Sequence, residues 1–389
     1  MSGFGAANLP YGVFRRAGEE PRVGVRFGDG VLDLAALAAD GLLDDPGGAF
    51  AQPALNAFMT RGPAAWAATR ERLQRLVSGV DAEPRLVPLE EAELLLPFVV
   101  ADYQDFWSSI QHASNSGRIF RPGSDDPLPP SWRHMPIAYH GRSATVVAGG
   151  TPVHRPHGQS RPSRDAGPVF GPSAKLDIEL ELGFVVGTPS RMGEPVPVGR
   201  ALEHVFGVVL LNDWSARDLQ AWESQPLGPF LGKSFATSIS PWVVPMAALE
   251  PFRAAPVTPQ EPEPLPYLRE AAWALDIDLE VELNGHRIAA TNARELYWSV
   301  AQQLAHLTVN GAHVRTGDLI GSGTISGPER EQRGSLLELS WDGAEPIALP
   351  DGSERTFLED GDEVVLRGVA GGGEDAVALG EVRGRIVGA

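Results

Sequence analysis

Acidic residues recur where a strand can present them together to a cation. In KLDIELELGF (175–184), period-two alternation places Asp177, Glu179 and Glu181 on one face and apolar residues on the other. Carboxylates at positions i and i+2 lie roughly 7 Å apart, so they can converge on one ion. Such oxygen ligands suit calcium or magnesium. The alternative is the solvated outer face of an amphipathic strand.

A second segment, ADYQDFWSSIQHASN (101–115), combines an acid with a histidine. The pattern predicts a short helix that begins at Asp105 as N-cap and stops at Gly117. On that helix Asp105 and His112 would share a face roughly 10 Å apart, lining one cavity without ligating the same ion. Histidine is suited to general-base chemistry near neutral pH. The alternatives are a plain cap and a histidine whose hydrogen bonds are satisfied on a helix face.

A third segment, VVLLNDWSARDLQAWESQPLGPFLGKSF (208–235), joins an apolar strand to a helix. Asp213 ends the strand, where it can supply another carboxylate, and Ser215 with Asp218 predicts a capping box. Lys233 follows in a glycine-rich turn. One face of the predicted helix carries three polar residues: Arg217, Gln220 and Ser224. The alternative is an ordinary strand–helix junction with a surface salt bridge.

A fourth segment lies near the C-terminus. Thr324 stands in a glycine-flanked turn of GDLIGSGTISGPERE (317–331), and Glu338 is the single acid of SLLELSW (335–341), which we expect to be a strand. An isolated glutamate in a strand usually faces water, so spacing alone assigns Glu338 no partner.

The elements that must position these residues are mostly strands. Short strand-like segments bounded by Gly, Pro, Asp or Asn follow residue 98 and predict a β-dominated barrel or roll. The first hundred residues suggest a separate module, with a hairpin over 22–34 and a helix over 64–79. Prolines make 83–97 an expected extended connector, and 250–268 an expected surface excursion.

Composition excludes several classes of function. The 32 basic and 50 acidic residues give a formal charge of −18, which argues against nucleic-acid partners and anionic membrane surfaces. There is no cysteine, so disulfides, thiol nucleophiles and zinc–thiolate sites are excluded. Without an apolar run long enough for a membrane span or a signal segment, we expect a cytoplasmic protein.

Together these segments resemble the fumarylacetoacetate hydrolase family, in its full-length type. The matching strings are DYQDFWSSIQHASN, IFRPGS, YHGR, GTPVHRPHGQ, KLDIELELGF, LLNDWSARDLQAWE, PLGPFLGKSFATSISPWVVP, SGTISGP, GSLLELSW and FLEDGDEV. The resemblance implies a mainly β fold, with a small SH3-like β-barrel and linker over residues 1–97 and a large catalytic β-roll over 98–389. It also implies a homodimer.

The resemblance further assigns ion ligands. Four carboxylates are implied to bind calcium, or magnesium or manganese in its place: Asp105, Glu179, Glu181 and Asp213. Lys233 and Thr237 are implied to lie at a second site near Asp213, for magnesium or a monovalent ion.

Catalytic and substrate-binding roles are assigned in the same way. His112 resembles the general base, with Glu338 orienting the histidine or the attacking water. Three residues are implied to steady the departing carbanion: Arg217, Gln220 and Lys233. Five are implied to contact the substrate: Trp107, Arg121, Gln220, Ser224 and Thr324.

The implied activity is metal-dependent hydrolysis of the carbon–carbon bond of 4-fumarylacetoacetate, a β-diketo acid, to fumarate and acetoacetate. This is the last step of tyrosine and phenylalanine catabolism. Trp107 and Ser224 stand where the family patterns DxDFYSS and WEYxPLGP carry tyrosines. One alternative is therefore a hydrolase of a related acyl β-diketone with a reshaped pocket. Another is a non-catalytic protein that kept the scaffold, against which the joint presence of the implied catalytic residues argues.

Overall fold

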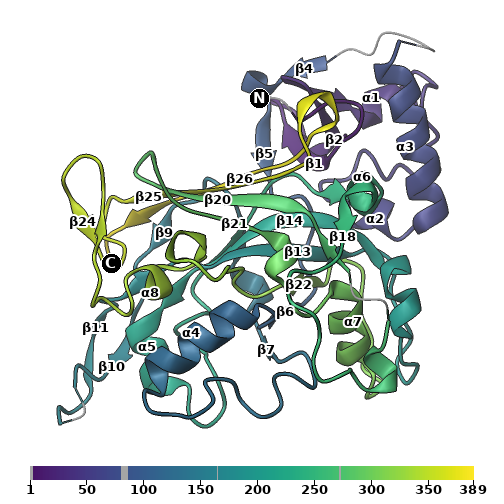
Figure 1. The fold of residues 1–389 in the computed structure, drawn as a ribbon. Helices are drawn as coiled ribbons and strands as arrows, with labels where there is room; N and C mark the ends of the chain where they lie inside the picture. The colour runs from purple at the N-terminus through teal and green to yellow at the C-terminus, as the bar shows by residue number, and fades with distance from the viewer. Residues whose placement is uncertain (1–2, 80–85, 164, 271–272) are drawn as a thin grey trace.

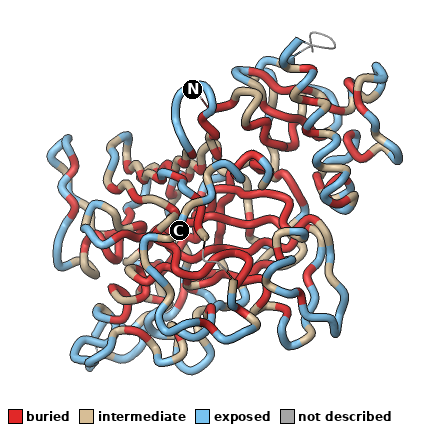
Figure 2. The backbone as a smooth tube through the Cα atoms, turned by 45° about the vertical axis from the view of Figure 1, so that its right-hand side comes forward, coloured by how far each residue is buried: buried red, intermediate tan, exposed pale blue. Residues whose placement is uncertain are grey.

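The centre of the molecule is an eight-stranded mixed sheet (Figure 1). The computed structural model describes residues 3–79, 86–163, 165–270 and 273–389. The strand order is β7-β6-β22-β13-β14-β16-β8, and β17 also pairs with β14. The strands are β6 (Tyr103–Phe106), β7 (Ala138–His140), β8 (Val146–Ala148), β13 (Leu180–Val186), β14 (Val205–Asp213), β16 (Thr237–Ile239), β17 (Val244–Pro245) and β22 (Leu319–Gly321). Strands β13 and β14 are buried throughout, which explains their nearly continuous apolar sequences (Figure 2).

A second, five-stranded sheet packs on one face of the central sheet, with the order β21-β20-β25-β26-β9. Its strands are β9 (Val153–His154), β20 (Ile277–Leu283), β21 (His286–Asn292), β25 (Glu363–Ala370) and β26 (Val377–Val387). The two sheets approach closely at Gly368, where a Cβ atom would lie 3.1 Å from Leu210 of β14. The main apolar core therefore lies between two sheets.

The N-terminal residues form a third sheet, in the order β4-β3-β2-β1-β5, beside three helices (Figure 1, purple and blue). These elements are β1 (Tyr11–Arg15), β2 (Arg22–Phe27), β3 (Gly30–Asp33), β4 (Leu86–Pro88), β5 (Glu93–Leu95), α1 (Leu34–Ala39), α2 (Asn56–Met59) and α3 (Pro63–Val77). Their apolar side chains form one cluster with the other face of the central sheet, including Val185, Leu211 and Leu319. The central sheet is thus covered on both faces.

The remaining helices and short strands lie around the central sheet. The helices are α4 (Ile110–Phe120), α5 (Arg217–Glu223), α6 (Met246–Leu249), α7 (Val300–Thr308) and α8 (Leu336–Leu339). The strands are β10 (His157–Ser160), β11 (Val169–Pro172), β12 (Leu176–Asp177), β15 (Ser215–Ala216), β18 (Arg253–Ala254), β19 (Ala274–Leu275), β23 (Ile347–Ala348) and β24 (Glu354–Arg355). Short 3-10 helices occupy Leu89–Glu91, Ser143–Thr145, Val198–Glu203, Glu250–Phe252, Pro266–Leu268, Ala293–Glu295, Arg330–Gln332 and Gly373–Asp375.

The expected mainly β architecture is confirmed, as are the hairpin over 22–34 (β2 and β3) and the helix over 64–79 (α3). The expected connector over 83–97 is wrong in part. Residues 83–85 lie outside the described residues, but β4 and β5 pair with β3 and β1 and complete the N-terminal sheet. The prolines of this segment do not prevent strand pairing, because β4 and β5 are the two edge strands of the sheet. An edge strand tolerates a proline, which has no backbone N–H to donate.

Within the described residues, no helix is both long enough and apolar enough to cross a lipid bilayer.

The attachment of the N-terminal sheet to the central sheet yields a stability prediction. Phe206 of β14 is buried, and its ring lies 5.5 Å from Tyr11, 5.9 Å from Phe58 and 5.2 Å from Trp66, measured between centroids. We expect Phe206→Ala to lower the free energy of unfolding by about 3–5 kcal/mol, because it leaves a cavity in this cluster. Chemical denaturation followed by tryptophan fluorescence measures the change.

Phe170→Ala is the matched control, since Phe170 is 76 % exposed and its loss should change the free energy of unfolding by less than about 0.5 kcal/mol. Equal stability of the two variants would contradict the packing role of Phe206.

Candidate active site

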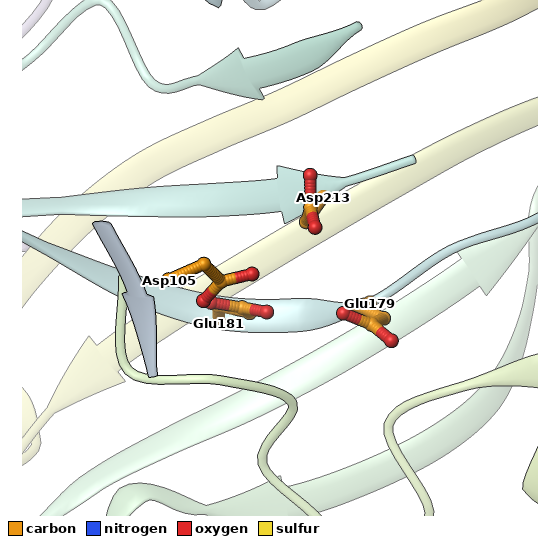
Figure 3. Close-up of side chains that lie close together, drawn as sticks. All are labelled: Asp105, Glu179, Glu181 and Asp213. Carbon is orange, nitrogen blue, oxygen red and sulfur yellow. The ribbon is translucent and has the colours of Figure 1, made fainter. Parts of the chain in front are cut away.

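Four carboxylates meet at one point of the central sheet (Figure 3). Asp105 comes from β6, Glu181 from β13 and Asp213 from the end of β14, while Glu179 lies immediately before β13. Each residue offers one oxygen atom, and these atoms all lie within 4.8 Å of one another. All four residues are buried. The convergence predicted for Glu179 and Glu181 is therefore present, and Asp105 and Asp213, the other two carboxylates that the resemblance implied, lie in the same cluster.

Strand alternation explains how the carboxylates meet. Glu181 lies on the same face of β13 as Val185, four residues on, and Asp213 on the same face of β14 as Leu211, two residues before it. Val185 and Leu211 pack against the N-terminal elements. Strand β22 lies between β6 and β13, and its Gly321 pairs with Asp105. A Cβ atom on Gly321 would lie 2.6 Å from Asp105 Oδ1 and 3.1 Å from Glu181 Oε2. The glycine thus leaves the space in which the carboxylates gather.

Asp177 departs from the predicted alternation. The strand is interrupted between β12 and β13, and the Asp177 carboxylate accepts hydrogen bonds from Arg217 Nε and from the backbone N–H groups of Leu336 and Leu337. It holds α8 and Arg217 in place, and it lies outside the four-carboxylate group.

The prediction that Asp105 caps a helix is wrong. Asp105 lies in β6, and helix α4 begins at Ile110 with Ser109 as its N-cap; the Ser109 hydroxyl accepts a hydrogen bond from the His112 backbone N–H. The helix also passes Gly117 and ends at Phe120. Asp105 and His112 nevertheless line the same cavity, as predicted.

Two buried cations face the carboxylates. Lys233 Nζ forms ion pairs with Glu179 and with Asp213 (2.9 Å), and Arg217 Nη1 lies 2.8 Å from Glu179 Oε1. Burial alone would raise the pKa of Glu179, but the charges of Lys233 and Arg217 outweigh burial and hold this pKa well below its usual value. Burial would lower the pKa of Lys233, but Asp213 and Glu179 raise it above its usual value. Glu179 and Lys233 are therefore both ionised.

Asp105 and Glu181 have fewer hydrogen-bond and ion-pair partners than Glu179 and Asp213. Asp105 Oδ1 and Glu181 Oε1 are buried, and neither accepts a hydrogen bond from the described residues. Burial raises the pKa of both groups, and the neighbouring carboxylates raise it further. Unpaired buried oxygens next to each other are costly unless a cation offsets them. The set of donors, four carboxylates, fits a hard divalent ion.

Tyr139 was missed in the sequence and belongs to this cluster. Its hydroxyl lies 3.0 Å from Asp105 Oδ2 and also contacts Asp213 Oδ2, while Thr237 Oγ1 donates to Asp213 Oδ1 at 2.9 Å. Burial, followed by the charges of Asp105 and Asp213, raises the pKa of Tyr139. Its signal was weak: one tyrosine in the short strand-like segment MPIAYH.

His112 and Glu338 form a buried pair. His112 Nδ1 lies 2.7 Å from Glu338 Oε2, whereas His112 Nε2 faces the cluster, 4.0 Å from Glu179 Oε1. The expectation of a strand at Glu338 is wrong, because SLLELSW forms the short helix α8, with Ser335 as N-cap. Short apolar runs of this kind fit either element. Burial would raise the pKa of Glu338, but His112 and several hydrogen bonds lower it.

The carboxylates and the His112–Glu338 pair open onto one cavity of about 1660 Å³. The five residues implied to contact substrate all line it: Trp107, Arg121, Gln220, Ser224 and Thr324. Two buried polar atoms at this cavity, Arg217 Nη2 and Thr324 Oγ1, have no hydrogen-bond partner among the described residues. They are available to bind the oxygen atoms of a ligand.

Helix α5 carries the polar face expected of it, since Arg217 Nη1 donates to Gln220 Oε1 at 3.1 Å. The predicted capping box is wrong, because Ser215 belongs to β15 and Asp218 instead accepts hydrogen bonds from Ser173 and Ala174. Ser224 is the C-cap of α5, and its hydroxyl donates to the Gln220 carbonyl.

Comparison with known proteins gives this site a family. The family described as "Fumarylacetoacetate (FAA) hydrolase C-terminal" matches residues 103–387, and "Fumarylacetoacetase N-terminal" matches residues 7–97. The chain belongs to the fumarylacetoacetate hydrolase family. Fumarylacetoacetase of Homo sapiens is 47 % identical and aligns over 99 % of this chain and 96 % of its own length. Fumarylacetoacetase of Arabidopsis thaliana is 46 % identical, with the same two coverages.

Two solved structures share the fold of this chain. A fumarylacetoacetate hydrolase from Exiguobacterium antarcticum superposes with a TM-score of 0.59 at 17 % identity, covering 98 % of this chain and all (100 %) of its own. A maleylpyruvate hydrolase from Sphingobium gives a TM-score of 0.54 at 15 % identity, covering 98 % of this chain and 100 % of its own.

The raised pKa values of Asp105 and Glu181 predict that ion binding is coupled to pH. In the unfolded chain these carboxyl groups have pKa values of about 4, and in the ion-free folded state their pKa values are higher. Between the two pKa values the folded state binds more protons than the unfolded state, so the free energy of unfolding falls as the pH rises. An ion needs both groups ionised and must displace those protons. We expect calcium to bind more tightly at pH 8 than at pH 6 and to release protons. Calorimetry in buffers of different ionisation enthalpy measures both.

The variant Glu181→Gln should weaken calcium binding by about 100-fold and release fewer protons. Glu203→Gln, which changes an exposed glutamate paired with Arg200, is the control and should bind as the parent does. Calcium binding that is independent of pH, without proton release, would contradict the raised pKa values of these two carboxylates, and unchanged affinity in Glu181→Gln would show that Glu181 is not a ligand.

Proposed function

We propose that this protein hydrolyses the carbon–carbon bond of 4-fumarylacetoacetate, giving fumarate and acetoacetate at the end of tyrosine and phenylalanine catabolism. The observation that carries the proposal is that a buried four-carboxylate cluster and the His112–Glu338 pair open onto one cavity. The full-length match to curated fumarylacetoacetases supports the substrate.

Asp105, Glu179, Glu181 and Asp213 would hold the divalent ion, calcium or in its place magnesium or manganese. When bound, such an ion acts as a Lewis acid toward the oxygen atoms of a 1,3-diketone. Lys233 and Thr237 would border a second site beside Asp213, for magnesium or a monovalent ion. The hydrogen bond from Thr237 to Asp213 supports this placement.

His112 would take the proton from the attacking water at Nε2. Nδ1 is bound to Glu338 Oε2, so the proton of a neutral imidazole resides on Nδ1 and the Nε2 lone pair faces the cavity. The ionised Glu338 stabilises the imidazolium that forms when His112 accepts the proton. Glu179 Oε1, 4.0 Å from Nε2, lies where it can orient the same water.

Departure of the product carbanion needs positive charge and hydrogen-bond donors at the opposite side of the bond. Arg217 and Lys233 supply the charge, and Gln220 is held against Arg217 by a 3.1 Å hydrogen bond. Donors already fixed in a dry cavity stabilise a developing enolate without reorganising. Trp107, Arg121 and Thr324, with Gln220 and Ser224, would contact the remainder of the substrate.

We assign the first 97 residues to an SH3-like barrel with its linker and residues 98–389 to the catalytic β-roll, in a cytoplasmic homodimer. The separate N-terminal sheet supports this division. Exposed apolar side chains beside the cavity mouth support association of two copies, since Leu227 and Phe230 are 96 % and 66 % exposed.

Replacement of His112 tests the proposed activity. We expect His112→Ala to lower the turnover of 4-fumarylacetoacetate by about 10²- to 10⁴-fold, the usual contribution of a general base. Calcium affinity should stay unchanged, because His112 is not a member of the carboxylate cluster. His134→Ala, which removes an exposed histidine, is the control. Loss of 4-fumarylacetoacetate absorbance measures turnover, and a rate equal to that of the control would rule out His112 as the base.

The second candidate is hydrolysis of a related acyl β-diketone, which the cavity wall at Trp107 and Ser224 favours. The Ser224 hydroxyl is engaged by the Gln220 carbonyl, so it is not free to donate to a substrate. If this candidate is correct, Trp107→Tyr combined with Ser224→Tyr should raise kcat/KM for 4-fumarylacetoacetate about tenfold, the value of one added hydrogen bond. An unchanged low kcat/KM in the double variant would exclude the reshaped pocket.

A further inference from the structure

Glu338 accepts more hydrogen bonds than its pairing with His112 requires. Its Oε2 atom accepts from His112 Nδ1 (2.7 Å), Ser326 Oγ (2.9 Å) and Ser335 Oγ (2.8 Å), and its Oε1 atom accepts from Asn115 Nδ2 (2.9 Å). The carboxylate and both serines are fully buried, and Asn115 is 6 % exposed. The carboxylate is therefore held in one orientation, away from water.

The direction of each hydrogen bond is fixed by its surroundings. Ser326 Oγ and Ser335 Oγ already accept from the backbone N–H groups of Gly334 and Glu338, so their protons point to the carboxylate. Arg118, which can only donate, contacts Asn115 Oδ1 at 3.3 Å, and this leaves the Asn115 amide nitrogen facing Glu338. A carboxylate that meets four donors is ionised and cannot take the proton on His112 Nδ1.

Asn115 differs from the other three donors in its place. The other three donors all meet at Oε2, and by themselves they would let the Glu338 carboxylate turn about that oxygen. The hydrogen bond from Asn115 to Oε1 prevents this rotation. Asn115 also lies three residues after His112 on α4. The same turn of the helix therefore carries both His112 and the residue that holds its partner Glu338. Among the described residues that line the cavity, Asn115 does not appear.

We infer that Asn115 is a positioning residue of the His112–Glu338 pair: it fixes the plane of the Glu338 carboxylate, and so keeps the His112 proton on Nδ1 and the Nε2 lone pair toward the cavity. The inference rests on the proposed general-base role of His112. It predicts an effect on the rate of the chemical step and none on substrate binding, because Asn115 touches the pair and not the cavity.

The test compares Asn115→Ala and Asn115→Asp with the parent protein. Asn115→Ala should lower kcat about 10- to 100-fold, as loss of an orienting partner usually does, with KM changed less than about twofold and calcium affinity unchanged. Asn115→Asp keeps the shape of the side chain but sets a carboxylate against Glu338 Oε1, so it should lower kcat at least as much. Asn292→Ala, which removes a half-buried asparagine at the end of β21 that donates to Asp276 and Asp278, is the matched control.

Nitrogen NMR of protein labelled with ¹⁵N-histidine separates positioning from a general structural effect. The parent should show His112 protonated on Nδ1 and unprotonated on Nε2 at neutral pH, and both Asn115 variants should show a mixture of tautomers. Wild-type kcat, or a lowered kcat with unchanged His112 nitrogen shifts, would overturn the inference. The tautomer is measured without substrate, so the two proposals can fail separately. If the parent does not hydrolyse 4-fumarylacetoacetate, the proposed function is contradicted. Loss of the Nδ1–H form in Asn115→Ala would still support the inference about Asn115.

Discussion

The structure depends on one electrostatic constraint: four carboxylates are buried within 4.8 Å of one another at the centre of a sheet. Like charges at that distance repel strongly in a dry interior, and an unpaired buried charge is costly. Lys233 and Arg217 offset part of the charge through Glu179 and Asp213. The remainder falls on Asp105 and Glu181, whose pKa values are raised. A divalent ion satisfies this remainder, so the cluster is arranged to bind one.

The fold keeps the carboxylates together despite their repulsion. β6, β22, β13 and β14 are hydrogen-bonded neighbours in the central sheet, which is covered on one face by the second sheet and on the other by the N-terminal elements. The carboxylates cannot move apart without breaking ladders that are buried on both sides. The same rigid frame carries two kinds of acid. Asp177 and Glu338 are surrounded by donors and hold other residues, whereas Asp105 and Glu181 keep free oxygens and can take an ion.

Sequence reasoning found the chemistry better than the local structure. Alternation correctly paired Glu179 with Glu181, because the two residues are only two positions apart at the start of β13 and their relative placement is set locally. It failed for Asp105, because pairing of β6 with β22, more than two hundred residues away, prevails over the helix signal, and Ser109 supplies the cap. It failed for Glu338, because a short apolar run fits a strand or a helix equally well. Tyr139 and Asn115 were missed since their partners lie 74 and 223 residues away and leave no local pattern. Resemblance to the family, not spacing, brought together all four carboxylates of the cluster.

Turnover of 4-fumarylacetoacetate is the most direct test of metal-dependent hydrolysis at the carboxylate cluster. Loss of substrate absorbance would be followed with the purified protein, then after dialysis against EDTA, and again after calcium is added back. We predict rapid turnover that disappears with the ion and returns with calcium, since the carboxylate cluster and His112 line one cavity. Turnover that is unaffected by complete removal of the ion would contradict the central role given to the four carboxylates. A protein that binds calcium but leaves 4-fumarylacetoacetate intact would contradict the proposed substrate.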